Sequence, residues 1–205
     1  PGGRLDLGTG YIVNEQGRQD HVSNTMSQPY YRFDGVNDYI DCGDESDLEL
    51  GTANFSISVR IKTPGVSGAS STICGKRAGG TPYWMWRLAS NGSLRFLWDD
   101  GSSGEFDTTV TGLDDDNEHL LVLTRDGTTF TYYVDGTEES SATKMMGDCS
   151  NSANFQIGVY NTTVDPFRGQ ISDLKFFNNA LTATEVKELY SGASVPYKYK
   201  GANQT

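Results

Sequence analysis

A short acidic segment carries the spacing most suggestive of catalysis. Glu45, Asp47 and Glu49 alternate along the sequence, so on a β-strand they would share one face. Two carboxylates roughly 5 Å apart can serve as the nucleophile and general acid of a glycoside hydrolase. The segment lies between two predicted strands, however, and acidic clusters usually face water. We therefore expect a solvated connection and no catalytic residue. The alternative is a glycoside hydrolase or lyase that uses these three carboxylates.

Other catalytic centres find little support in the residue types present. His21 and His119 are the only histidines, and the chain has no HExxH motif or Cys/His pairing that would hold zinc. It also lacks the G-x-S-x-G elbow of serine hydrolases. Cys42, Cys74 and Cys149 are odd in number and widely spaced, which favours buried or half-buried free thiols over one long-range disulfide.

The aromatic residues between positions 83 and 98 raise the possibility of sugar binding. On a strand, Trp84 and Trp86 point to one face and Tyr83 and Arg87 to the other, and one of these faces must be core. We expect the tryptophans to pack between two sheets. This leaves the following ligand-binding candidates on strand and loop: Tyr83, Arg87, Tyr160 and Asn161.

Charge and hydropathy exclude two classes of partner. The net charge is -11, and no cluster of Lys and Arg is present of the kind that displaces counterions from nucleic acid. No run approaches the roughly 18 apolar residues of a membrane span. We expect neither nucleic-acid binding nor membrane insertion.

The elements that must position these residues are short strands. Phe55, Ile57, Val59 and Ile61 alternate with polar residues, which predicts a strand with one wet face. The run 120–123 is apolar on both faces, as expected of a central strand under a covering element. Further strands are predicted, several joined by Asx-Gly turns at 91–92, 100–101, 126–127 and 135–136, over residues 38–42, 72–75, 83–88, 94–98, 119–125, 130–134, 155–159 and 170–177.

The C-terminal part predicts one short helix. Thr182 and Glu185 have the spacing of a capping box, Val186 and Leu189 follow at helical spacing, and Gly192 is a stop signal. Residues 1–29 are polar and poorly periodic, and periodicity is lost again over 193–205. We expect an N-terminal arm (1–29), one packed domain (30–192) and a tail or linker (193–205).

Three groups of motifs resemble the laminin-G-like jelly roll of the concanavalin A-like lectin/glucanase superfamily. They occupy residues 33–40, residues 124–127 with 133–136, and residues 167–173 leading into 179–181. The resemblance covers about residues 30–192 and implies an all-β, two-sheet antiparallel jelly-roll sandwich with one short C-terminal helix. Residues 117–119 depart from it, because the aromatic that usually precedes the central strand is missing.

The resemblance also implies a cation. Jelly rolls of this superfamily often hold a structural Ca²⁺ where the first and last strands meet, and the matching motifs would bring Asp34, Asp38 and Asp173 there. The alternative is that Asp34 and Asp38 form the turn through Gly35 by local hydrogen bonds. Residues 114–116 are three consecutive aspartates that could bind a cation, although a solvated loop is favoured.

The flanks, residues 19–31 and 191–196, look like those around laminin-G-like modules of tailed-phage structural proteins. Together these resemblances imply a non-enzymatic, lectin-like module of a virion or extracellular surface protein, such as a fibre, appendage or decoration piece. Its partners would be a glycan or neighbouring structural subunits, contacted through loops at the rim of the sandwich, in a homo-oligomer or a larger polypeptide. A spacer domain without a ligand is the remaining alternative.

Overall fold

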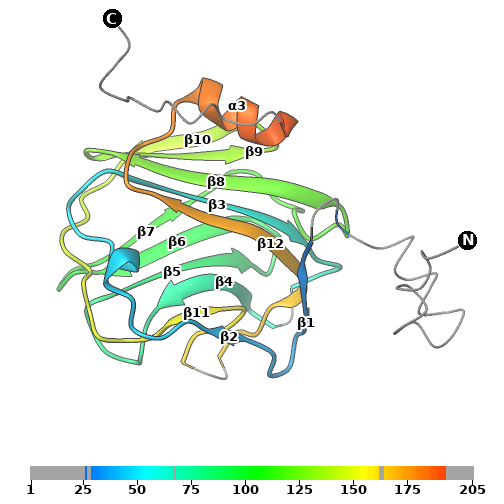
Figure 1. Cartoon of the computed structure of the whole chain (residues 1–205), viewed down its shortest axis with the longest axis horizontal. Helices are drawn as coiled ribbons and strands as arrows, with labels where there is room; N and C mark the ends of the chain where they lie inside the picture. The colour runs from blue at the N-terminus through cyan, green and yellow to red at the C-terminus, as the bar shows by residue number, and fades with distance from the viewer. Residues whose placement is uncertain (1–25, 27–28, 67, 162–163, 193–205) are drawn as a thin grey trace, which may run out of the picture.

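The computed structural model describes residues 26, 29–66, 68–161 and 164–192. It is a sandwich of two antiparallel sheets of six strands each, with one short α-helix on its outside (Figure 1). Sheet A has the order β1-β12-β3-β8-β9-β10. Its strands are β1 (Tyr31–Asp34), β12 (Arg168–Phe177), β3 (Phe55–Lys62), β8 (Glu118–Asp126), β9 (Thr129–Val134) and β10 (Thr137–Thr143).

Sheet B has the order β2-β11-β4-β5-β6-β7. Its strands are β2 (Ile40–Asp41), β11 (Phe155–Ile157), β4 (Ser70–Lys76), β5 (Tyr83–Ala89), β6 (Leu94–Asp99) and β7 (Ser103–Asp107). The predicted fold class, an all-β antiparallel sandwich with a short C-terminal helix, is confirmed.

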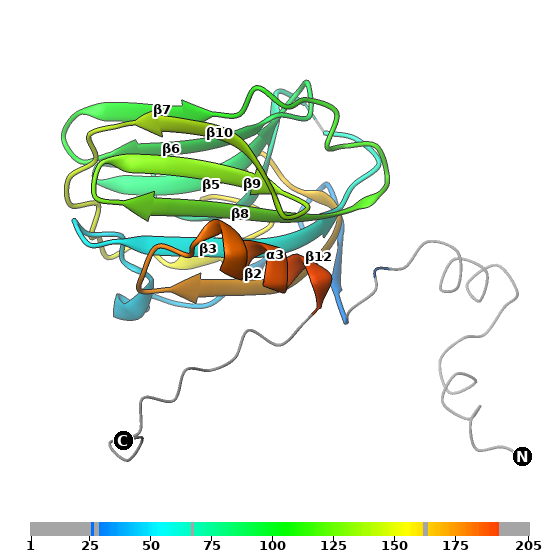
Figure 2. The same ribbon diagram turned by 90° about the horizontal axis from the view of Figure 1, so that it is seen from above.

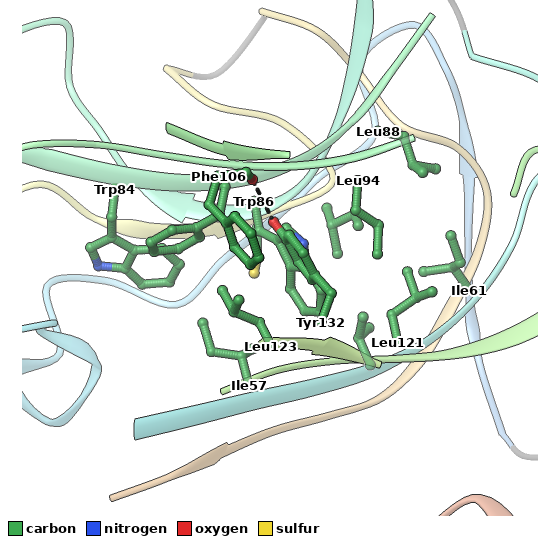
Figure 3. Close-up of a cluster of buried hydrophobic side chains, with 14 of the residues drawn as sticks. Ile57, Ile61, Trp84, Trp86, Leu88, Leu94, Phe106, Leu121, Leu123 and Tyr132 are labelled. Carbon is green, nitrogen blue, oxygen red and sulfur yellow. Dashed lines mark hydrogen bonds between the residues drawn. The ribbon is translucent and has the colours of Figure 1, made fainter. Parts of the chain in front are cut away.

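Aromatic rings fill the space between the two sheets. Trp84 and Trp86 are fully buried there, as predicted from the alternation along their strand. Tyr132 stacks on Phe106 with ring centroids 4.6 Å apart and donates its hydroxyl to the Phe106 carbonyl oxygen at 3.1 Å (Figure 3). Each such ring pair contributes about 0.5–1.5 kcal/mol beyond its buried area. The tryptophans therefore stabilise the core and are not available to a ligand.

The helix α3 (Ala183–Ser191) covers the outer face of sheet A (Figure 2). Leu120 and Val122 of β8 point to this face and pack in one cluster with Leu181 and Val186. The predicted capping box is confirmed, since the Thr182 hydroxyl accepts from the Glu185 amide and the Glu185 carboxylate accepts from the Thr182 amide. The helix ends at Gly192, whose φ of 70° is left-handed. Within the described ranges, no helix has the length and apolarity needed to cross a bilayer.

This helix makes one sequence prediction wrong. The polar face of β3 was expected to be wet, but Ser56 and Ser58 are buried. The Ser56 hydroxyl donates to the Asn179 carbonyl oxygen at 2.9 Å and accepts from the Leu181 amide at 2.8 Å. Arg60 donates to the Leu189 carbonyl oxygen at the C-terminal end of the helix. Alternation identified the face correctly, and the segment that covers it is distant in sequence.

Two of the strands that sequence patterning missed are at the sheet edges. β7 and β10 each have only one strand neighbour among the described residues, and most of their side chains are polar and at least partly exposed. Edge strands bury little, so their composition resembles that of loops. The turn between β9 and β10 follows the prediction, because Asp135 and Gly136 both have positive φ, 50° and 81°.

The three cysteines are free thiols, two of them buried, as expected. Burial raises the pKa of the Cys149 thiol to about 12. The expected arm and tail lie outside the described residues, except for Met26 and Pro29. Met26 is buried, and its amide donates to the Gln170 side-chain oxygen on β12 at 3.1 Å.

Candidate functional site

The outer face of sheet B has no helix over it in the described part of the chain. Since Trp84 and Trp86 point into the core, Tyr83 and Arg87 point outward from β5. Strand register then places Arg87 opposite Arg95 of β6, and Arg95 opposite Asp107 of β7. We call this surface the open face; its polar and aromatic residues are Arg77, Tyr83, Arg87, Arg95, Asp107, Tyr160 and Asp165.

Arg77 joins two aromatic rings at one end of the open face. Its guanidinium carbon lies 4.0 Å from the centroid of the Tyr83 ring and 5.0 Å from that of Tyr160. Each cation–π contact of this kind contributes about 0.5–1 kcal/mol at a partly exposed position. Both tyrosines are half-buried, so each keeps part of its surface toward solvent. Exposed Asn161, with a φ of 49°, follows Tyr160 in the same loop.

Arg87 is fixed by the other end of that loop. It donates to a carboxylate oxygen of Asp165 at 2.6 Å, and the same oxygen accepts from the Ser70 hydroxyl at 2.8 Å. Asp165 has a left-handed φ of 51°, and its carbonyl oxygen accepts from the Thr72 amide at 2.8 Å. The Arg87 and Asp165 side chains retain 14% and 22% exposure. Loop and sheet thus hold one donor and one acceptor together at the surface.

Arg95 repeats this arrangement one strand further along. Its Nε and Nη2 both donate to the Asp107 carboxylate, the latter at 2.6 Å. This hydrogen bonding raises the pKa of the Arg95 guanidinium. Arg87 and Arg95 lie directly opposite each other and would repel, but the positive charge of each is offset by its own carboxylate. The open face therefore presents a row of paired donors and acceptors near one end of β5 and two aromatic rings near its other end. This combination suits hydrogen bonding and stacking against a polyhydroxylated molecule.

The structure brings the four predicted ligand-binding candidates, Tyr83, Arg87, Tyr160 and Asn161, to this side of the molecule. Sequence reasoning missed Arg77, Arg95, Asp107 and Asp165. The alternation of Leu94, Phe96 and Trp98 contained the signal for Arg95. The other three depend on strand register and on the path of a loop, for which the sequence carried no comparable signal.

The acidic segment 45–49 does not form a strand. Ser46–Leu48 is a 3-10 helix, so Glu45, Asp47 and Glu49 do not share a strand face as the hydrolase alternative requires. Glu45 and Asp47 are exposed, in line with a solvated connection.

Glu49 has a structural contact that sequence reasoning missed. Its carboxylate lies 3.5 Å from Nζ of Lys76, whose side chain is fully buried and which also donates to Asp44 at 2.7 Å. A buried ammonium group needs such partners, because desolvation otherwise disfavours its charge. Glu49 is therefore occupied in stabilising a buried charge.

The three carboxylates expected to hold calcium do not come together. One Asp34 oxygen accepts from the Val36 and Asn37 amides, and Asp38 accepts from the Asp34 amide, which is the turn alternative. The Val36 hydrogen bond lowers the pKa of Asp34.

Asp173 lies too far from Asp34 and Asp38 to share a metal ion with them. It pairs with Lys175 at 2.7 Å, and it lies five residues beyond Arg168, the β12 partner of Asp34, or roughly 16 Å along the strand. No group of three His, Cys, Asp or Glu side chains in the described residues is placed to hold a metal. The residues present do not fit the expected Ca²⁺.

Within the three consecutive aspartates 114–116, Asp115 makes hydrogen bonds to residues that follow it closely in sequence. Asp115 accepts from the Asn117 amide at 2.9 Å and lies 3.2 Å from Nε2 of His119. Nδ1 of His119 lies 2.8 Å from Asp135. The Asp115 contacts are the local hydrogen bonds of a loop, which the sequence favoured over a cation site.

Comparison with known proteins gives a family match and several matches of fold. Residues 34–187 match the family model described as the concanavalin A-like lectin/glucanases superfamily. No curated protein matches the chain in sequence.

Among solved structures, the Ruminococcus gnavus IT-sialidase CBM40 bound to alpha2,3 sialyllactose has a TM-score of 0.66 at 13% identity, over 80% of this chain and 97% of that one. Domain 4 of AbnA, a GH43 extracellular arabinanase from Geobacillus stearothermophilus, in complex with arabinotriose, has a TM-score of 0.65 at 20% identity, over 82% of this chain and 79% of that one. The botulinum neurotoxin serotype G binding domain has a TM-score of 0.67 at 17% identity, over 84% of this chain and 44% of that longer one. At these identities the likeness concerns the fold.

Proposed function

The chain belongs to the concanavalin A-like lectin/glucanases superfamily, and from that premise we propose that it is a non-enzymatic carbohydrate-binding module whose ligand binds the open face of sheet B. The observation that carries the proposal is the pairing of every arginine on this face. Arg77 lies between two tyrosine rings, and Arg87 and Arg95 each hold a carboxylate at the surface. Adjacent sugar hydroxyls both donate and accept, and sugar rings have apolar faces, so they complement such a surface.

The fold neighbours support a binding role. The printed descriptions of two of them name a bound sugar, sialyllactose for the sialidase CBM40 and arabinotriose for the arabinanase domain. The toxin neighbour is itself described as a binding domain. A shared fold does not by itself transfer a function, so the proposal depends on the residues of the open face.

The positions of the acidic residues also favour binding over hydrolysis. A retaining glycoside hydrolase needs two carboxylates about 5 Å apart across the scissile bond. In the segment 45–49, the carboxylate of Glu49 contacts buried Lys76, and a 3-10 helix separates it from Glu45.

For its setting, we propose an extracellular or virion surface, where the module acts as part of a fibre, appendage or decoration protein. The resemblance of the flanking residues 19–31 and 191–196 to those of phage modules supports the virion version. In this setting the open face meets a glycan, while a neighbouring subunit contacts other parts of the chain.

A glycan array followed by calorimetry tests the proposal. The wild-type chain should bind at least one immobilised glycan saturably. Tyr160→Ala should weaken that binding about tenfold, since losing a ring contact of ~1–1.5 kcal/mol changes Kd by that factor. The matched control is Tyr190→Ala, which removes a 48% exposed ring from α3 on the other side of the sandwich and should leave affinity unchanged.

The two variants must keep the wild-type thermal midpoint for the comparison to count. Absence of binding across the array would refute the carbohydrate role and would favour a decoration or spacer domain. Equal losses for Tyr160→Ala and Tyr190→Ala would place the site elsewhere.

A further inference from the structure

A groove separates the two exposed edges of the sandwich. It has a volume of about 420 Å³ and lies between β7 of sheet B and β10 of sheet A, which run side by side (Figure 2). Phe106 and Ala142 are among its apolar lining residues, and Glu105, Glu139 and Ser140 are among its polar ones. The volume is within the range of small-ligand sites, about 300–1,000 Å³.

The two edges are linked by hydrogen bonding beside the groove. The Thr109 amide donates to the Ser140 hydroxyl at 3.2 Å, and both residues line the groove. A register shift between Glu138 and Ser140 places Glu139 outside the regular ladder of β10. Such bulges change the direction in which a side chain points. The groove is therefore shaped by specific backbone features of both edge strands.

The groove continues the open face. Register pairs Asp107 with Arg95 and Glu105 with Leu97, so both acids project outward from sheet B, and both also line the groove. The row that begins at Arg87 therefore ends at the groove rim. Tyr83 lies two strands across and four register positions along from Asp107, so the diagonal span between the tyrosine end and the groove is roughly 16 Å. A ligand that reached both ends would be longer than a single sugar ring.

This surface carries no excess of positive charge. Among the open face, the groove and the outward end of β6, the cationic side chains are Arg77, Arg87, Arg95 and Lys144, and the anionic ones are Asp99, Glu105, Asp107, Glu139 and Asp165. The whole chain carries -11. An anionic sugar chain would lose hydration here without meeting an excess of positive charge. The surface thus selects against carboxylated or sulfated ligands.

We infer that the open face and the groove form one extended site, and that its ligand is a neutral oligosaccharide lying diagonally across the strands from β5 to β7. This inference rests on the proposed carbohydrate-binding function and adds the length and the charge of the ligand. The Tyr83 and Tyr160 rings take one end of the oligosaccharide, the Arg95–Asp107 pair binds its middle, and the groove takes the units beyond Asp107.

Calorimetric titration with oligosaccharide ladders tests the inference. The probes are neutral ladders of arabinose, xylose, glucose and galactose, each from one to six units, and galacturonic acid ladders of the same lengths. Affinity for at least one neutral ladder should rise at least tenfold between one and four units. The galacturonic acid ladder should bind more weakly than the neutral ladder at every length.

Variants of the groove separate its contribution from that of the rings. The double variant Glu105→Gln, Glu139→Gln should weaken binding of the four-unit ligand about tenfold and leave the one-unit ligand unchanged. Glu138→Gln is the matched control, since Glu138 is exposed on β10 and does not line the groove. Thermal midpoints of all variants should match the wild type.

The outcomes distinguish the two claims. If no ladder binds, the proposed function fails and this inference fails with it. If a ladder binds with no gain beyond one unit, or if the groove variants behave as Glu138→Gln does, the carbohydrate role stands and the extended site is wrong. Tighter binding of galacturonic acid ladders would overturn the assignment of a neutral ligand.

Discussion

The outer faces of the two sheets differ in what covers them. Both arise from strands whose alternate residues point away from a shared aromatic core. On sheet A these residues include Leu120 and Val122, and α3 packs over them. On sheet B they include Arg87 and Arg95, and no helix covers them in the described residues. The comparison teaches that the covered face contributes stability, whereas the open face keeps Arg87, Arg95 and their carboxylates partly exposed.

The largest expected effect is a difference in the free energy of unfolding between two variants, each with one leucine truncated on one of the two faces. Leu120 is 2% exposed under α3, whereas Leu97 points outward from β6 and is only half-buried. Leu120→Ala should lower the free energy of unfolding by about 2–4 kcal/mol, because it leaves a cavity. Leu97→Ala should lower it by less than about 1 kcal/mol. Urea denaturation of both variants measures the difference, and equal losses would contradict the division between the faces.

A smaller effect on the free energy of unfolding is expected from removing the Ser56 hydroxyl, which connects β3 to the segment before α3. Ser56→Ala leaves the buried Leu181 amide without its acceptor, which costs about 1–3 kcal/mol. Ser172 is a matched control on the same covered face, since it is 5% exposed and its hydroxyl has no hydrogen-bond partner among the residues that the structure describes. Ser172→Ala should be neutral or slightly stabilising. A loss at Ser172 as large as that at Ser56 would show that packing, not hydrogen bonding, holds the cover in place.

The smallest expected effect is on the pH dependence of stability, and it comes from His119 at the start of β8, next to Leu120. Hydrogen bonding to Asp135, with a further contribution from Asp115, raises the pKa of His119 above its ordinary 6.5. The charged imidazole therefore stabilises the folded state fully below about pH 6.5, and this contribution is lost as pH rises through the raised pKa. Thermal midpoints should fall across that interval in the wild type. His119→Gln should flatten the dependence, and an unchanged slope would exclude His119 as its source.

Several features of the fold followed from local sequence signals. Thr182 and Glu185 specified the start of α3, and Gly192 its end. The apolar run 120–123 predicted a strand covered on both sides, which β8 is. The Asx-Gly pair at 135–136 marked a hairpin. These signals work because each depends on contacts within a few residues or on a periodicity that burial imposes directly.

The failures have a common physical cause, which is that the partner lies far away in sequence. Ser56 is buried by residues near position 180. Lys76 is buried because Asp44 and Glu49 supply its counter-charges from another connection. Asp173 was expected beside Asp34, but the register of β1 against β12 sets them apart. Alternation placed Tyr83 and Arg87 on the outer face of sheet B, whereas Asp165 gave no local signal because its position depends on a loop crossing the sheet. The ligand-binding role of these residues stays a prediction.

The helix α3 also makes the two sides of the sandwich different, because one side carries the helix and the other carries the open face. The described chain enters through β1 and leaves through α3, and both of these elements belong to the sheet A side of the sandwich (Figure 1). The open face is the outer surface of the other sheet. Copies mounted through their chain ends on a common support would therefore all present their sites outward. Weak individual contacts would then add through avidity, because a first contact raises the effective concentration for the next.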